Sequence, residues 1–260
     1  MSTARSLAAW CRLEAQAALS FRVQLMTQVF GWVVPLAFMA LWGFATNATG
    51  IMTQGQTTAY YLVQLVMTTL TFTYEVVFGL GMSLYSGELS MLVLMPFPPI
   101  LSVMAKPVIR AVIGSVPLII IVPLLSWTLR ADYAVEPATV VAAIMLGMVG
   151  WLSTLAFCCV CGLSAFWMGK WDAVLSLVLG VQWVLGGLIA PSVFTPPWLA
   201  WTMRLSPLWL GSGGVAELLS GAVPLAWWMP VVGAGWAVGL IVAFRVAWPH
   251  AMRRYEGVGI

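Results

Sequence analysis

Charged side chains are the scarcest feature of this sequence. Asp, Glu, Lys and Arg make up only 7% of the 260 residues, whereas about 25% is usual for a soluble domain. Hydrophobic residues supply 62% of the chain, and the mean hydropathy is +1.00. Because so few charges cannot cover the surface of a water-soluble globule, the composition excludes that class and predicts an integral membrane protein.

The groups that usually carry catalysis or bind metals are also rare. The sequence has one histidine, His250, and four cysteines, of which Cys158, Cys159 and Cys161 lie within one apolar run. Without histidine or acidic neighbours, these three cysteines are predicted to pack rather than to bind a metal. No Gly-x-x-x-x-Gly-Lys-Ser/Thr phosphate loop occurs, so we expect neither enzyme activity nor a cofactor in this chain.

Apolar runs fill most of the sequence. A bilayer core about 30 Å thick is crossed by a helix of about 20 residues. We therefore expect an all-α integral membrane fold with six transmembrane helices, at 26–46, 58–82, 100–129, 138–166, 173–190 and 226–248. Residues 1–25 have the amphipathic pattern of an N-terminal helix lying in the membrane interface, ahead of a transmembrane domain at 26–248.

The basic residues predict the orientation, because short loops rich in Lys and Arg stay in the cytoplasm. With the N-terminus inside, only Arg130 and Arg204 lie outside. The other nine lie at or near the inner face: Arg5, Arg12, Arg22, Lys106, Arg110, Lys170, Arg245, Arg253 and Arg254. We expect a multi-pass protein of the plasma (inner) membrane, with a cytoplasmic tail at 249–260 and lipid around it. The scattered charges exclude a nucleic-acid partner.

Two connections between the expected spans are unusually apolar. The cytoplasmic connection 83–99 contains a short run that Pro96, Pro98 and Pro99 interrupt, too short to cross a membrane. Either neighbouring helices of this chain or the groove of a partner protein must cover it. The connection 191–225 is rich in Trp, Pro and Gly, and we expect it to form re-entrant helices in the outer leaflet.

The connection 83–99 also carries a family resemblance. Ser86-Gly87-Glu88-Leu89-Ser90, followed by Leu94-Met95-Pro96, is similar to the Gly-Glu-Leu-Asp, Leu-Leu and Arg-Pro pattern of one subfamily of ABC-2 permeases, the membrane subunits of type-2 ABC exporters. The closing Arg253-Arg254-Tyr255-Glu256-Gly257-Val258-Gly259 resembles the tail of the same proteins. The resemblance covers nearly the whole chain, including the six spans.

This resemblance implies an exporter permease that a separate ABC ATPase drives. The ATPase would bind ATP and Mg, and would contact a cytoplasmic coupling helix within 83–99 through Gly87, Glu88, Leu89, Met91, Leu92 and Pro96. Where the subfamily has Asp and Arg or Lys, this chain has Ser90, Met91 and Met95. The more apolar contact favours pairing with a different permease subunit over a homodimer.

Glu75 is the one acidic residue deep in an expected span. An ionisable group there normally faces protein or a water-filled path. One interpretation places Tyr74, Glu75 and Gln182 on the transport path. The other makes Glu75 a buried tie to a neighbouring helix, with Gln182 or Tyr85 as its partner.

Two other functions remain open at this point. A membrane scaffold that recruits a soluble partner would need the same apolar connection at 83–99. An ion-coupled secondary carrier would depend mainly on Glu75, and the sequence shows no internal repeat that favours it.

Overall fold

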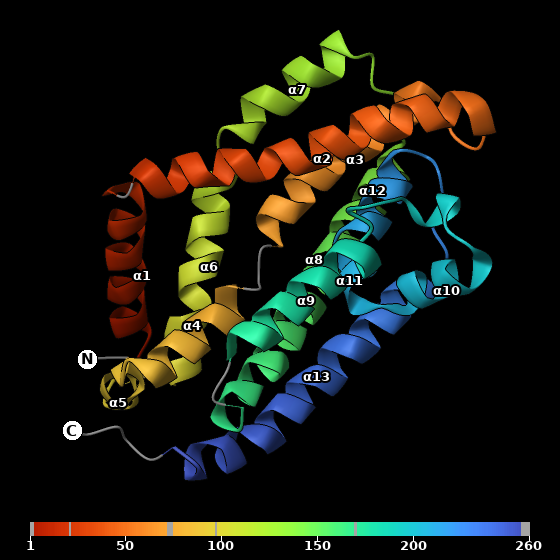
Figure 1. The fold of residues 1–260 in the computed structure, drawn as a ribbon. Helices are drawn as coiled ribbons and strands as arrows, with labels where there is room; N and C mark the ends of the chain where they lie inside the picture. Colours follow the sequence, from red (N-terminus) through yellow and green to blue (C-terminus); the bar gives the residue numbers. More distant parts are fainter. Residues whose placement is uncertain (1–2, 21, 72–74, 97, 169–170, 256–260) are drawn as a thin grey trace.

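The computed structural model describes residues 3–20, 22–71, 75–96, 98–168 and 171–255, and these residues form helices and no strand (Figure 1). The first seven helices are α1 (Thr3–Ser20), α2 (Arg22–Thr49), α3 (Gln54–Leu70), α4 (Glu75–Tyr85), α5 (Glu88–Val93), α6 (Pro99–Ser115) and α7 (Leu118–Thr128). The other six are α8 (Pro137–Leu163), α9 (Trp171–Leu185), α10 (Pro197–Leu205), α11 (Pro207–Gly211), α12 (Gly213–Leu219) and α13 (Trp228–Arg253). The all-helical prediction is confirmed for this part of the chain.

Three helical segments are long and apolar enough to cross a membrane: Gln54–Tyr85, Pro137–Phe166 and Trp228–Arg253. The bent pair α6–α7 would make a fourth span if it is one crossing. The expected spans at 26–46 and 173–190 fall on the shorter apolar helices Gly31–Thr46 and Trp171–Leu185. The structure therefore supports a membrane protein, and the count of six spans stays a prediction.

Prolines determine where several helices begin or break. Pro99, Pro137, Pro197 and Pro207 occupy the first helical turn of α6, α8, α10 and α11, where the missing N–H would have no partner in any case. Within the expected span 100–129, the chain instead bends by 45° between α6 and α7. Pro117 lies at this bend, and a proline inside a helix removes one backbone hydrogen bond and clashes with the preceding turn.

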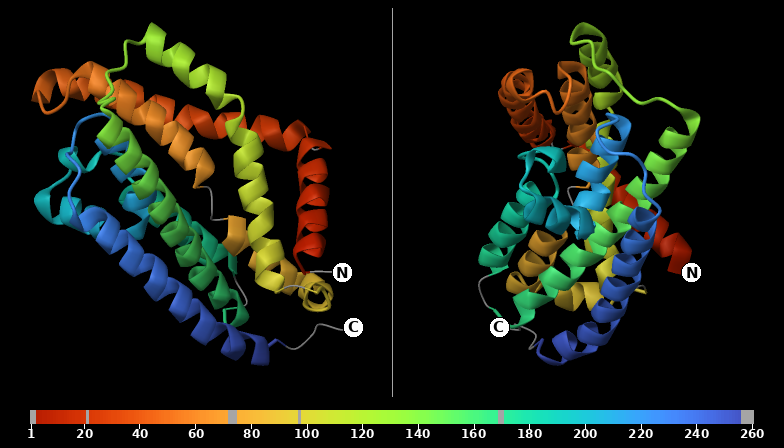
Figure 2. Two further views of the ribbon diagram at one scale, coloured as in Figure 1. Left: turned by 180° about the vertical axis from the view of Figure 1, so that it is seen from behind. Right: turned by 90° about the vertical axis from the view of Figure 1, so that its right-hand side faces the viewer.

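Buried side chains form two clusters at opposite ends of the bundle, and α8 contributes to both (Figures 1 and 2). The first cluster joins α3 and α8 to α11, α12 and the start of α13, around the fully buried Tyr60, Trp209 and Leu210. The second joins α4, α5, α6, α8 and α9, around Leu80 and Leu89. The two ends of the bundle therefore have separate hydrophobic cores, which α8 connects.

The segment 191–225 forms short helices that lie inside the first cluster. Helices α11 and α12 pack against α8, and α12 also packs against α3. The approach is close at Gly150 of α8, where an added Cβ would lie 2.4 Å from the backbone of Leu210. Only glycine at position 150 lets α11 come this near to α8.

Candidate functional site

Helix α5 lies at the end of the bundle where the chain termini also lie (Figures 1 and 2). Gly87 precedes it with a φ of 74°, a left-handed conformation that glycine adopts without strain. Glu88 opens the helix and places a carboxylate near the positive end of the helix dipole. Pro96 and Pro98 follow within a few residues and prevent the helix from continuing.

The two sides of α5 have different environments. Leu89 and Leu92 are 0% and 2% exposed and belong to the second core cluster, with Val76 and Leu80 of α4. Met91 and Leu94 are 70% and 86% exposed. One apolar side of the helix is therefore packed into the core, and the other apolar side lies on the surface of the chain.

This geometry changes the expected partner contact. Leu89 and Leu92 were expected to touch the ATPase, but a side chain in the chain's own core is out of reach of a partner. Gly87 and Glu88 are half-buried, whereas Met91 and Pro96 are exposed and remain available. Leu94, the C-cap residue of α5, is absent from the predicted contact set and is also exposed. Neighbouring helices of this chain thus bury one side of the apolar run in 83–99. The other side is exposed and could be buried by a partner protein.

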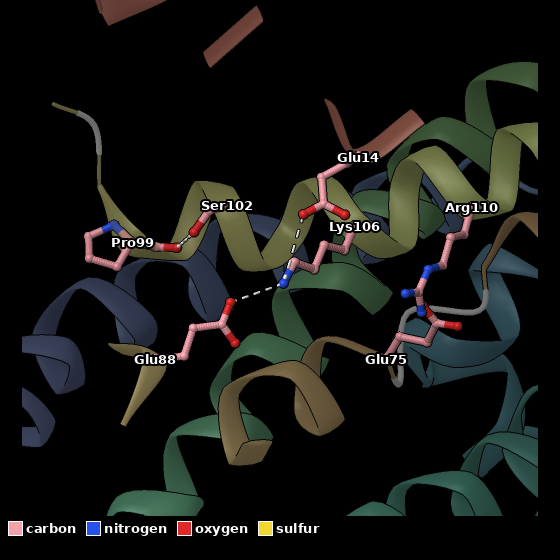
Figure 3. Close-up of polar contacts among 7 residues, drawn as sticks. All are labelled: Glu14, Glu75, Glu88, Pro99, Ser102, Lys106 and Arg110. Carbon is pink, nitrogen blue, oxygen red and sulfur yellow. Dashed lines mark hydrogen bonds and ion pairs between the residues drawn. The ribbon is translucent and has the colours of Figure 1, made fainter. Parts of the chain in front are cut away.

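Lys106 of α6 ties α5 to α1 (Figure 3). Its Nζ lies 3.3 Å from Glu88 Oε1 and 3.8 Å from Glu14 Oε1. The same ammonium lies 5.9 Å from the ring centroid of Trp10 on α1, within range of a cation–π interaction. One cation thus holds the N-terminal helix and the short helix α5 on the same side of α6.

Arg110 lies one helical turn beyond Lys106 and binds Glu75 of α4 (Figure 3). Its Nη1 donates to Glu75 Oε2 at 3.2 Å. Since residues four apart lie on one face of a helix, Lys106 and Arg110 make α6 a common partner for α1, α4 and α5. Ser102 completes this face by donating to the Pro99 carbonyl at 2.6 Å, within the first turn of α6.

The structure corrects the expected partner of Glu75. Gln182 was one candidate, but its Nε2 donates to the carbonyl of Thr71 at 3.1 Å. Tyr85, the other candidate, is 80% exposed. Tyr74 lies outside the described residues. Glu75 is thus an interhelical tie to Arg110, and the transport path through Tyr74, Glu75 and Gln182 stays a prediction.

A second polar cluster, which the sequence analysis missed, lies in the opposite core. The Glu217 side chain is fully buried and accepts hydrogen bonds from the backbone N–H of Ser192 and, at 2.7 Å, from the Ser192 hydroxyl. Arg204 Nε donates to the same hydroxyl at 3.0 Å. Glu217 and Arg204 are the only charged residues in 191–225. This isolation in an apolar segment was the available signal that they share an environment.

Comparisons with known proteins leave the family open. No protein-family model matches the chain, and no curated protein matches it. Within the described ranges, no group of three His, Cys, Asp or Glu side chains is arranged to hold a metal ion. The contacts described around α5 are ion pairs and hydrogen bonds beside an exposed apolar surface.

Proposed function

We propose that this chain is the membrane permease subunit of an ATP-driven exporter, and that a separate ATPase moves it through α5. The observation that carries the proposal is the two-sided packing of α5. Leu89 and Leu92 fix the helix to the core beside α4 and α6. Met91 and Leu94 present an apolar surface on the other side, which needs a protein groove to leave water.

A movement of α5 would be transmitted through the helices that it contacts. Well-packed interfaces move as rigid units rather than deforming continuously. A displacement of α5 is therefore passed to α4 through the shared core. It also reaches α6 through the Lys106–Glu88 ion pair. Helix α4 belongs to the candidate span Gln54–Tyr85, so movement at the membrane surface becomes movement of a membrane helix.

The finer parts of the proposal come from the sequence. The pattern at 86–96 resembles ABC-2 permeases, which implies six spans, re-entrant helices in 191–225, a plasma (inner) membrane location and export. ATP and Mg would bind to the ATPase. A second permease subunit, different from this one, would complete the transport path at the interface between the two.

The exposed side of α5 also favours a second candidate, a scaffold that recruits a soluble partner without transport. Both functions use the same surface, and they differ in whether the bound partner hydrolyses ATP. The third function, an ion-coupled carrier, is disfavoured because its required carboxylate, Glu75, is paired with Arg110.

The test is to purify the tagged full-length chain from its native membranes in a mild detergent and to measure the vanadate-sensitive ATPase activity that elutes with it. We expect the double variant Met91→Asp, Leu94→Asp to elute with at least tenfold less ATPase activity than the wild type, because burying a carboxylate in an apolar groove is strongly unfavourable. The control is Ser86→Asp, which adds a charge at an exposed position on the same connection without removing an apolar contact.

Two results would contradict the proposal. The wild-type chain would elute without an ATPase, or the double variant would keep the full activity. A partner that has no ATPase activity and is lost in the double variant would identify the scaffold instead.

A further inference from the structure

The C-terminal end of α13 lies against α5, although the two are far apart in the sequence. The hydroxyl groups of Ser90 and Tyr255 are 2.7 Å apart, a hydrogen-bond distance between residues 165 positions apart. Met252 and the Tyr255 ring pack against the core cluster that contains Leu89 and Leu92. In the ribbon views, the end of α13 and α5 lie at the same end of the molecule (Figures 1 and 2). The end of α13 and Tyr255 are thus attached to α5 and its core by packing and by a hydrogen bond.

This attachment brings the chain segment that carries two exposed cations to α5. Arg253 and Arg254 lie between Met252 and Tyr255, and both are exposed. The ion pairs among the described residues use Lys106 and Arg110 and leave these two arginines without an acidic partner. Carboxylates thus neutralise the nearby cations of α6, whereas Arg253 and Arg254 meet none of the acidic residues that the structure describes.

We infer that the end of α13 is the second half of the surface that binds the ATPase. The partner would present an apolar groove to Met91 and Leu94, and carboxylates at its edge to Arg253 and Arg254. This assignment rests on the proposed function and adds to it the charge of the partner's surface. Opposite charges at the rim of an interface guide association and fix its register.

Tyr255 is a positioning residue in this arrangement. Its hydrogen bond to Ser90 holds the end of α13 in a fixed relation to α5, so the cations and the apolar side form one rigid surface. Arranging such groups before binding lowers the entropic cost of association. Removing the hydroxyl leaves the ring packing in place and tests this contribution alone.

The experiment places a photo-crosslinking benzoylphenylalanine at position 91 in the full-length chain in its native membranes. The adduct is identified by mass spectrometry and quantified. We expect an ATP-binding protein in the adduct. The paired change Arg253→Gln and Arg254→Gln should lower its yield about tenfold, since two rim charge pairs are lost. Arg253→Lys with Arg254→Lys keeps the charges and should stay within about twofold of the wild-type yield.

Tyr255→Phe and Ser90→Ala should each lower the yield about threefold, and their combination should lower it no further, because both remove the same hydrogen bond. Raising the salt concentration should lower the wild-type yield and leave the Gln pair unchanged.

The outcomes distinguish this inference from the proposed function. An adduct that contains no ATP-binding protein overturns both. If the adduct contains an ATP-binding protein but its yield is unchanged in the Gln pair, only the role of α13 is overturned. Arg253 and Arg254 would then be assigned to contact with anionic lipid headgroups.

Discussion

The two polar clusters of this chain are built in opposite ways. Glu217 is 0% exposed and is surrounded by hydrogen-bond donors within the core of α3, α8, α11 and α12. Glu88 and Lys106 have side chains that are 40% and 31% exposed. Breaking a buried charged cluster leaves an unpaired charge in an apolar medium, whereas exposed ion pairs contribute little. The comparison indicates that polar contacts stabilise the end around Glu217 more strongly than the end where α5 lies, which apolar packing holds together.

Glu217→Ala tests the end around the buried carboxylate and should have the largest effect of the polar substitutions. The change leaves the backbone N–H and hydroxyl of Ser192 without their acceptor and Arg204 without a nearby counter-charge. We expect a loss of about 3 kcal/mol in the free energy of unfolding, measured by denaturant titration in detergent. Glu136→Ala, at an exposed position, is the control. Equal stability of the two variants would show that the buried cluster contributes nothing.

Comparing Leu89→Ala with Met91→Ala tests the difference between the buried and the exposed side of α5. Leu89 is fully buried and Met91 is 70% exposed. Truncating a buried leucine costs about 2 to 5 kcal/mol, whereas a surface change stays within about 0.5 kcal/mol. The melting temperature in detergent should fall clearly for the first variant and stay near the wild type for the second. The reverse order would mean that α5 is anchored by its other side.

The Glu75–Arg110 pair should contribute an intermediate amount. Its side chains are 21% and 36% exposed, so water screens the interaction in part. A double-mutant cycle with Glu75→Gln and Arg110→Gln should give a coupling free energy of about 1 kcal/mol in the stability assay. Additive losses from the two single variants would refute the tie between α4 and α6.

Lys106→Gln should have the smallest effect of the polar substitutions. Lys106 is shared between Glu88 at 3.3 Å and Glu14 at 3.8 Å, and all three side chains are partly exposed. We expect a loss below about 1 kcal/mol that disappears as the salt concentration rises. A large loss of stability that does not depend on salt would show that the Lys106 ion pairs stabilise the fold as strongly as the buried Glu217 cluster.

Composition and long apolar runs were enough to predict the coarse fold. The runs at 138–166 and 226–248 were predicted close to the observed bounds of α8 and α13. The prolines after Met95 likewise marked the short helix α5. Each of these features is local in sequence, so propensity and the requirement to bury backbone groups decide them.

The contacts between helices could not be read in the same way. Leu89, Met91 and Leu92 of α5 and Leu94 directly after it are all apolar, and the packing of α5 against α4 and α6 decides which of them are buried. Arg110 is 35 residues from Glu75, and its pairing depends on how α6 packs beside α4. The spacing of four between Lys106 and Arg110 shows in the sequence that they share a face of α6, but it does not show which carboxylates they meet.

The sidedness of α5 tests the central claim most directly, because an ATPase can drive the chain only from the cytoplasm. In a cysteine-free variant in intact cells, a single cysteine replaces Leu94, which is 86% exposed, or Val135, which is 72% exposed and precedes α8 at the opposite end. We predict that position 94 reacts only with membrane-permeant thiol reagents and that position 135 reacts with impermeant ones. Labelling of position 94 by an impermeant reagent would contradict the coupling of α5 to an ATPase.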